Sequence, residues 1–205
     1  MNKVYVYVMN TMADWELGFV MAELNSKRFF KKDAKEIELK TVAVTKNPVK
    51  SMGGLTITPD LTIDEIEINE KNALLLPGSD TWAEPENMKI IQIAKEFLAS
   101  GGLVSAICGA TVALGNAGIL DDKAHTSNGA GFLDMFCPEY KGAPHFQDVP
   151  AIRDGNLITA GCTGALEMTK LILEYLDVLG NDKLDHWYKY FSTGDAAEFF
   201  ALMQG

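Results

Sequence analysis

Cys108 is the residue in this chain whose surroundings best predict chemistry. The apolar run 103–107 is rich in β-forming residues and leads into Cys108, small residues follow at once, and a helical pattern begins near residue 110. This order predicts a strand, a tight turn and a helix, an arrangement that exposes a nucleophile at the edge of a sheet. Helix N–H groups favour the thiolate, which is the nucleophilic form of cysteine. The pattern therefore predicts a reactive thiol, and the alternative is a buried structural cysteine.

The elements that must position this thiol alternate between strand and helix along the whole chain. Predicted strands cover 3–9, 37–44, 73–76, 103–108, 124–127, 149–153 and 157–160. Predicted helices cover 13–30, 86–99, 110–117, 131–136, 162–179 and 182–203, and the last is interrupted near 192–194. Apolar strands that alternate with helices are typical of a mostly parallel sheet covered by helices on both faces. We therefore expect an α/β fold in one domain over residues 1–205, with a C-terminal helical tail.

Three of the predicted strands end in turns that carry glycine. The turns are Pro77-Gly78-Ser79, Cys108-Gly109-Ala110 and Ala160-Gly161-Cys162. Parallel strands end at one edge of a sheet, and ligand sites form beyond that edge where the strand order reverses. We therefore expect a pocket at Cys108, with Gly78 and Cys162 close to it.

Two tryptophans, Trp15 and Trp82, follow the ends of predicted strands. They either form walls of the pocket, which would restrict it to small or apolar ligands, or pack in the core or in a dimer contact. A disulfide between Cys108 and Cys162 is a further alternative, although the geometry that a disulfide needs is restrictive.

Composition excludes several classes of protein. The chain has 47% hydrophobic and 22% charged residues and a formal net charge of −10, which argues against nucleic acid or an anionic membrane as a partner. The apolar start is interpreted as a core strand, because a signal peptide needs a longer apolar stretch and a cleavage site. Three cysteines without CxxC spacing and three dispersed histidines suggest neither a disulfide framework nor a metal site. We expect a cytoplasmic protein without metal or cofactor.

Four segments together resemble a known family. The segments 74–78 (Leu-Leu-Leu-Pro-Gly) and 106–110 (Ala-Ile-Cys-Gly-Ala), with the block 13–17 and the hairpin 154–160, resemble the ThiJ/PfpI family of the class I glutamine amidotransferase-like superfamily. The resemblance covers nearly the whole chain. It implies a flavodoxin-like three-layer sandwich with a mostly parallel central sheet, a homodimer, and a reactive cysteine at a nucleophile elbow.

The resemblance also implies roles for the neighbours of Cys108. Glu16 matches a glutamate that lies beside the cysteine in relatives. A carboxylic acid in that place favours thiolate if its own pKa is raised enough to keep the proton; the alternative is a solvated helix carboxylate. The N–H groups of Gly109 and Ser79 match the pair that stabilises an oxyanion. Many relatives have glycine where this chain has Ser79, so we expect the serine side chain to narrow the site.

The chain also departs from the family in two places. Proteolytic members have histidine directly after the cysteine, whereas this chain has Gly109, so their peptidase chemistry does not transfer by motif. Other members place histidine near the end of the strand after the elbow helix, and here Ser127 occupies that position. His125 lies two residues earlier, on the same side of a strand. It either acts as a general base or is a partly buried structural histidine.

The sequence thus leaves three functions to compare. The leading hypothesis is a cysteine-dependent enzyme on a small-molecule electrophile, with Cys108 as nucleophile and Glu16 as its assistant, and with hydrolase, amidase-like or glyoxalase-like activity. The alternative is a stress-response or redox-sensing protein that works through oxidation of Cys108. The third is a non-catalytic dimer or ligand-binding module that keeps only the fold.

Overall fold

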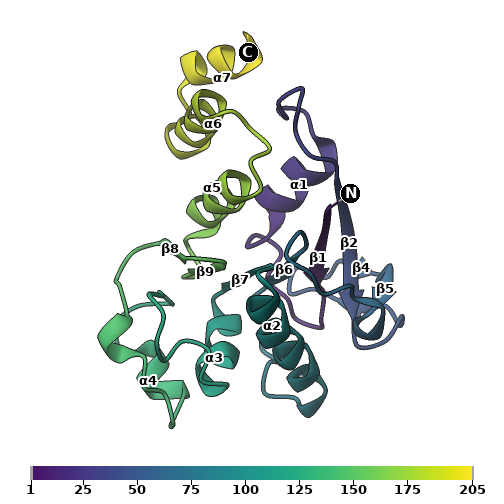
Figure 1. The fold of residues 1–205 in the computed structure, drawn as a ribbon, viewed down its shortest axis with the longest axis vertical. Coiled ribbons are helices and arrows are strands. Elements are labelled where there is room, and N and C mark those ends of the chain that lie inside the picture. The colour runs from purple at the N-terminus through teal and green to yellow at the C-terminus, as the bar shows by residue number, and fades with distance from the viewer. Residues whose placement is uncertain (1, 205) are drawn as a thin grey trace.

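A seven-stranded sheet forms the centre of the structure, a computed structural model that describes residues 2–204 (Figure 1). In spatial order its strands are β5 (Leu61–Thr62), β2 (Ile37–Ala43), β1 (Asn2–Tyr7), β6 (Ala73–Leu76), β7 (Leu103–Ile107), β9 (Leu157–Ala160) and β8 (Ala151–Asp154). Every neighbouring pair is parallel except β8 and β9, which form an antiparallel hairpin. Every residue of β6 and β7 is buried, as continuous apolar runs in a parallel sheet require.

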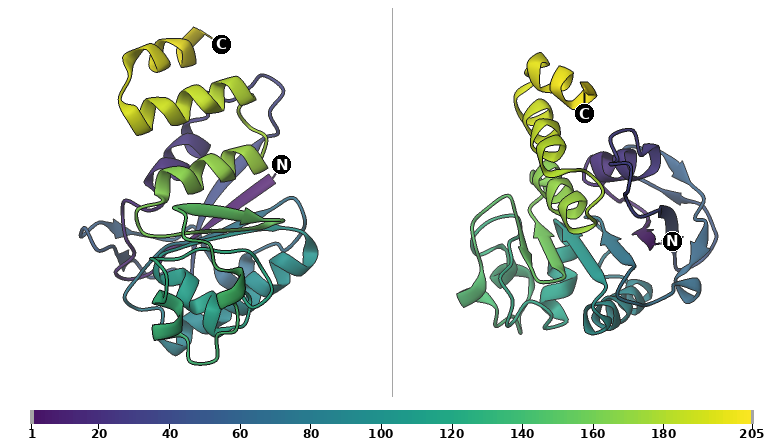
Figure 2. Two further views of the ribbon diagram at one scale, coloured as in Figure 1. Left: turned by 90° about the vertical axis from the view of Figure 1, so that its left-hand side faces the viewer. Right: turned by 45° about the horizontal axis from the view of Figure 1, so that its top comes forward.

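Helices cover both faces of this sheet (Figures 1 and 2). One face carries α1 (Gly18–Ser26) and α5 (Ala165–Tyr175), and the other carries α2 (Met88–Ser100) and α3 (Gly109–Asn116). The structure therefore confirms the predicted α/β class and its flavodoxin-like, three-layer arrangement. Two further helices, α6 (Asn181–Thr193) and α7 (Ala196–Gln204), extend the layer of α5 away from the sheet, as Figure 2 shows.

The remaining elements are short and lie in the connections. They are the hairpin of β3 (Val49–Lys50) and β4 (Thr56–Ile57), the helix α4 (Phe132–Phe136), and the 3₁₀ turns η1 (Ile63–Glu65), η2 (Pro85–Asn87) and η3 (Ala143–His145). Among residues 2–204, none of the helices combines the length and the apolar character that crossing a lipid bilayer requires.

The order of the strands reverses between β1 and β6. The chain passes from β1 to β2 on one side, and β6, β7 and β9 then follow one another on the other side. The turns after β6, β7 and β9 are the three glycine-bearing turns of the sequence, so they lie at one edge of the sheet. That edge, next to the reversal, is where ligand sites form in open α/β sheets.

Two differences between the predicted elements and the structure affect the site. The helix expected over 13–30 begins only at Gly18, because Ala13 N–H donates to Gly78 O (2.9 Å) and ties this part of the chain to the turn after β6. The strand expected over 124–127 is reduced to a single bridge between His125 and Phe146. Here a side chain of the β8–β9 hairpin takes the place of a backbone partner on a neighbouring strand, since Thr126 N–H donates to Thr159 Oγ1 at 2.9 Å.

Candidate active site

Cys108 lies between β7 and α3 in a strained backbone conformation. Its φ of 57° and ψ of −123° fall in a region that favours glycine, and such strain costs about 1–3 kcal/mol. The surrounding structure holds it there, because Cys108 N–H donates to Ala160 O (3.0 Å) and Thr111 N–H donates to Cys108 O (3.0 Å). The side chain is half-buried. The structure thus places the thiol at the strand–turn–helix junction that the sequence predicted.

Glu16 is fully buried beside this thiol and is not a solvated helix carboxylate. Its Oε2 accepts a hydrogen bond from Gly78 N–H at 2.5 Å. Its Oε1 has no hydrogen-bond partner among the described residues, and the nearby Cys108 thiol acts on the pKa of Glu16. A Cβ at Gly78 would lie 2.7 Å from Oε2 and 2.8 Å from Cβ of Cys108, so glycine is what allows the two side chains to meet.

The buried pair of Glu16 and Cys108 holds a proton in neutral solution. Burial raises the pKa of Glu16, although the hydrogen bonds with Gly78 and Cys108 oppose this. Burial and the Glu16 charge raise the pKa of the Cys108 thiol to about 11, so burial outweighs the helix effect expected from the sequence. Two negative charges side by side are disfavoured. The thiolate forms when the shared proton is on Glu16.

Asn128 is a site residue that the sequence reasoning missed. Its Nδ2 donates to Cys108 Sγ at 3.3 Å, and its Oδ1 accepts from Cys162 N–H at 2.8 Å. Because a backbone N–H can only donate, the second bond fixes the amide with its NH₂ group toward the sulfur. This donor lowers the pKa of Cys108 against the effect of burial. The sequence feature that could have identified Asn128 is its position directly after a predicted strand and before Gly129.

The positions that the sequence proposed for a general base are used elsewhere. His125 is buried, and its Nδ1 bonds to Lys123 O at 2.7 Å, so Nδ1 carries the hydrogen and Nε2 accepts from the Tyr140 hydroxyl. Burial lowers the pKa of His125, which keeps the ring neutral. Ser127 Oγ pairs with Thr111 Oγ1 at 2.6 Å. The geometry supports the structural alternative for His125 and offers neither ring nitrogen to Cys108.

The turn after β6 faces the start of α3. A Cβ at Gly109 would lie 3.4 Å from Ser79 N, and the N–H of Ser79 has no hydrogen-bond acceptor among residues 2–204. The Ser79 hydroxyl donates to Asn10 O (2.8 Å) and lies 3.0 Å from Thr11 Oγ1. The hydroxyl therefore anchors the turn, whereas the sequence led us to expect that it narrows the site.

A cavity of about 400 Å³ opens in front of Cys108. Its lining includes Glu16, Gly78, Ser79, Gly109, Asn128, Trp15 and Trp82. Trp82 is a buried wall whose Nε1 donates to Pro77 O at 2.8 Å, and Trp15 is half-exposed with its Nε1 3.2 Å from Cys162 O. Both tryptophans therefore line the pocket, as one of the two interpretations proposed.

Cys162 lies outside that lining, contrary to its predicted place in the pocket. It belongs to a neighbouring cavity of about 360 Å³, of which Asn128 is also a lining residue. The turn after β9 reaches the site through its backbone, because Cys162 N–H and Cys162 O bind Asn128 and Trp15. All three cysteines are free thiols in the structure.

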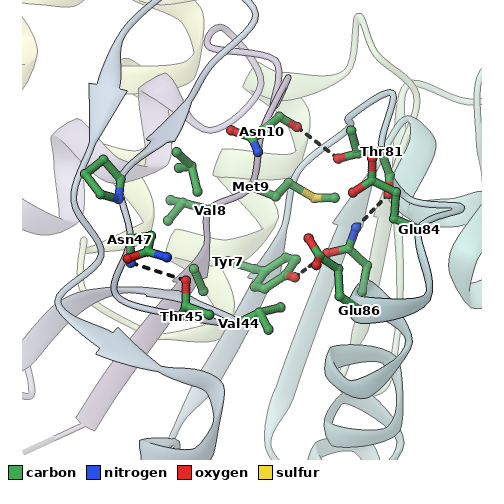
Figure 3. A pocket seen from close by; sticks show the side chains of 14 residues that line it. Tyr7, Val8, Met9, Asn10, Val44, Thr45, Asn47, Thr81, Glu84 and Glu86 are labelled. Carbon is green, nitrogen blue, oxygen red and sulfur yellow. Dashed lines mark hydrogen bonds between the residues drawn. The ribbon is translucent and has the colours of Figure 1, made fainter.

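A separate cavity of about 280 Å³ lies at the ends of β1 and β2 (Figure 3). There the Tyr7 hydroxyl donates to Asn87 Oδ1 at 2.5 Å, and Thr81 Oγ1 donates to Asn10 O at 3.0 Å. Figure 3 shows this second bond at the rim of the cavity. Asn10 O also accepts from Ser79, so this region supports the turn that faces Cys108.

The fold and the geometry around Cys108 define a flavodoxin-like protein with a cysteine at a nucleophile elbow. A sequence model of the DJ-1/PfpI family matches residues 2–175, and the chain belongs to this family. This confirms the resemblance that the sequence motifs indicated.

Relatives of known sequence or structure extend over most of the chain. The chain is 42% identical to "Uncharacterized protease YoaZ" of Bacillus subtilis over 202 residues, which cover 98% of this chain and 96% of that protein. A solved structure of a thiJ/pfpI family protein from Bacillus anthracis is 42% identical, with a TM-score of 0.97 over 100% of this chain and 97% of that one. "Deglycase PfpI" of Pyrococcus furiosus is 27% identical over 133 residues, which cover 63% of this chain and 76% of that protein.

Proposed function

We propose that this protein is a cysteine-dependent enzyme in which Cys108 adds to the carbonyl carbon of a small electrophile. The observation that carries the proposal is a half-buried thiol next to a buried carboxyl group, Glu16, with both groups lining one cavity. A proton shared between these two groups allows the thiol to become a nucleophile without releasing a proton to solvent.

The addition step balances within the site. The thiolate electron pair of Cys108 forms a C–S bond, and the π electrons of the carbonyl group move to its oxygen. The N–H groups of Ser79 and Gly109 stabilise that oxyanion, each by about 3 kcal/mol, until it takes the proton from Glu16. The product is a tetrahedral adduct on Cys108, and Glu16 is then a carboxylate that can accept the next proton.

The protons available at the site favour glyoxalase-like conversion of an α-oxoaldehyde over hydrolysis of an amide. No histidine lines the cavity in the part of the chain that the structure describes, so Glu16 is the group that must move protons. An aldehyde has no leaving amine to protonate, and one carboxyl group can serve it as acid and then as base. The name of the Pyrococcus furiosus relative, a deglycase, is consistent with carbonyl chemistry. Hydrolysis of an activated ester or amide is the second reaction that the same adduct allows.

Turnover of a substrate panel tests this proposal. Methylglyoxal, an activated ester and a simple amide are offered to the wild type and to Cys108→Ser, and the free energy of unfolding is measured in parallel to show that the variant is folded. We expect methylglyoxal to be consumed, with a loss of roughly a hundredfold or more in Cys108→Ser. Equal rates in wild type and variant would refute the proposal.

A redox-sensing role is the second candidate function, and the donors around the sulfur favour it. Asn128 Nδ2 lies 3.3 Å from Sγ, and the Ser79 and Gly109 N–H groups and Glu16 line the same cavity. One peroxide converts the thiolate to sulfenate and water, and a second gives sulfinate and water. Mass spectrometry after mild peroxide should find two added oxygens on Cys108 before Cys162 is altered. Oxidation of Cys162 first would exclude this role.

We also propose that the protein acts as a homodimer in the cytoplasm, as the family resemblance implies. Three free thiols are consistent with a reducing compartment. Light scattering during gel filtration should give twice the mass of the chain, and a monomer at micromolar concentration would contradict the proposal.

A further inference from the structure

We infer that the cavity at Cys108 selects compact, uncharged electrophiles that carry an apolar group, such as an aryl or branched alkyl α-oxoaldehyde. This inference rests on the proposed function and adds the substrate class. The cavity shows three features that select such a molecule: the composition of its walls, the signs of its charges, and the way its rim is held in place.

Apolar side chains surround the path to the sulfur. They are Trp15, Met52, Trp82, Val112, Phe132 and Phe136. Trp82 forms the inner wall, since a Cβ at Gly109 would lie only 3.2 Å from its Cδ1. Trp15, Met52 and Phe136 stand at the mouth and are each about half-exposed, at 53%, 47% and 51%. An apolar substituent that covers these side chains gains the free energy of removing both surfaces from water.

The charges in the cavity disfavour an anionic substrate. Its ionisable lining groups are Cys108, Glu16 and Asp80, and no lysine, arginine or histidine of the described residues lines it. A carboxylate or phosphate on the substrate would therefore lose water without gaining a cationic partner. Asp80 also lines the cavity but is exposed, so solvent screens its attraction for a cation. The neutral, apolar class is the one that meets no such penalty.

Hydrogen bonds hold the apolar rim in place before any ligand binds. Gly53 N–H donates to Asp14 Oδ2 at 2.5 Å and Met52 N–H donates to Met12 O at 2.9 Å, which fix the loop that carries Met52. Trp15 is tied to Cys162 O, and the ring of Phe136 packs on Phe132 with their centroids 4.9 Å apart. Because the rim is already ordered, little of the binding free energy is lost in ordering its side chains when a ligand binds. The shape and polarity of the rim therefore determine which ligands bind.

Site-resolved alkylation with three maleimides tests the substrate class without requiring turnover. The reagents share one reactive ring and carry a benzyl, a 2-carboxyethyl or a 2-aminoethyl group. Each adds to a thiolate through a new C–S bond, and the resulting enolate takes a proton from solvent. Mass spectrometry follows Cys108 and Cys162 separately. Cys162 is the internal reference, because it is half-exposed, shares the net charge of the molecule and lies in a different cavity.

The quantity compared is the rate of the benzyl reagent divided by the rate of a charged reagent. We expect this ratio to be about tenfold higher at Cys108 than at Cys162 for either charged reagent. In Phe136→Ala this preference should fall roughly threefold, because one of the three apolar side chains at the mouth is lost. Met135→Ala is the matched control, since Met135 is the neighbouring residue of α4, is 76% exposed and does not line the cavity.

The outcomes separate this inference from the proposed function. Equal preferences at Cys108 and Cys162, or an equal effect of Phe136→Ala and Met135→Ala, would overturn the substrate class and leave the nucleophile intact. Failure of all three reagents at Cys108, while Cys162 reacts, would overturn the proposed function and this inference with it.

Discussion

At the scale of single residues, the position of one proton decides whether Cys108 is a nucleophile. Glu16 is buried and its negative charge raises the pKa of the Cys108 thiol, so protonation of Glu16 favours the thiolate. Asn128 and the N–H of Gly109 act in the opposite direction to burial, because both stabilise the charged sulfur. The site therefore balances a desolvation penalty against two donors, and the side-chain donor Asn128 can be removed by a single substitution.

The role of Glu16 can be measured as a change in the pH profile of Cys108 alkylation. Both variants remove a negative charge that raises the pKa of the Cys108 thiol. We therefore expect the alkaline midpoint of iodoacetamide labelling to fall by about one pH unit in Glu16→Gln, the equivalent of ~1.4 kcal/mol, and to fall also in Glu16→Leu. An unchanged midpoint in both variants would show that Glu16 does not hold the shared proton.

Asn128 offers a test in which the shape of the side chain is kept. Asn128→Asp retains the oxygen that accepts from Cys162 N–H but replaces the NH₂ group near Cys108 Sγ by a charged oxygen. We expect labelling of Cys108 at pH 7 to fall by about tenfold or more, and Asn128→Ala to fall less, because it loses a donor without adding a charge. A variant Asn128→Asp that labels as fast as Asn128→Ala would contradict this electrostatic role.

At the scale of elements, the site depends on turns that bring β1, β6 and β7 together at one sheet edge. The contact between Glu16 and Cys108 exists because Gly78 has no side chain. The start of α3 exists in its present place because the backbone of Cys108 turns sharply at a φ of 57°. Both features are backbone properties, so each can be tested with small substitutions.

Gly78→Ala should uncouple Glu16 from Cys108. The new Cβ would meet both side chains at less than 3 Å, so the turn after β6 must shift. We expect labelling of Cys108 at pH 7 to rise roughly severalfold, because a shift of about 1 Å moves the sulfur away from Glu16, whose charge raises the pKa of the thiol. Gly180→Ala is the matched control, since a Cβ there meets nothing within 4 Å. A normal rate in Gly78→Ala would mean that the contact is dispensable.

The strained backbone at Cys108 is expected to lower the free energy of unfolding of the protein. Cys108→Gly relieves the backbone strain, whereas Cys108→Ala keeps it, and the extra entropy of glycine in the unfolded chain offsets part of the gain. We expect Cys108→Gly to be about 1 kcal/mol more stable than Cys108→Ala in urea unfolding. Greater stability of Cys108→Ala would show that the turn is not strained.

The sequence predicted these elements unevenly, and the reason is physical. β6 was predicted with its true bounds and β7 to within one residue, because continuous apolar runs between turn residues report burial on both faces. Glu16 was placed by resemblance, but its helix was begun too early, since the bond from Ala13 to Gly78 O is a long-range contact that no local pattern encodes. Asn128 was missed because its orientation depends on the bond from Cys162 N–H, a long-range contact that no local pattern encodes.

At the scale of the whole molecule, the site contributes to stability in a pH-dependent way. The pKa of the Cys108 thiol rises from its ordinary value of 9.0 to about 11 on folding, through burial first and then the repulsion from Glu16. The folded protein therefore holds this proton more tightly than the unfolded chain does. Stability from this source is present below pH 9 and is lost as the pH rises through about 11.

Comparison of the wild type with Cys108→Ser isolates this effect from the rest of the molecule. The net charge of −10 grows more negative at alkaline pH and destabilises both proteins by nearly the same amount, so it cancels in their difference. Urea unfolding under reducing conditions at pH 8, 9, 10 and 10.5 should show the wild type losing stability relative to Cys108→Ser at each step above pH 9. A difference that stays constant with pH would mean that the thiol titrates as in the unfolded chain, which would remove the buried, shared proton on which Cys108 reactivity depends.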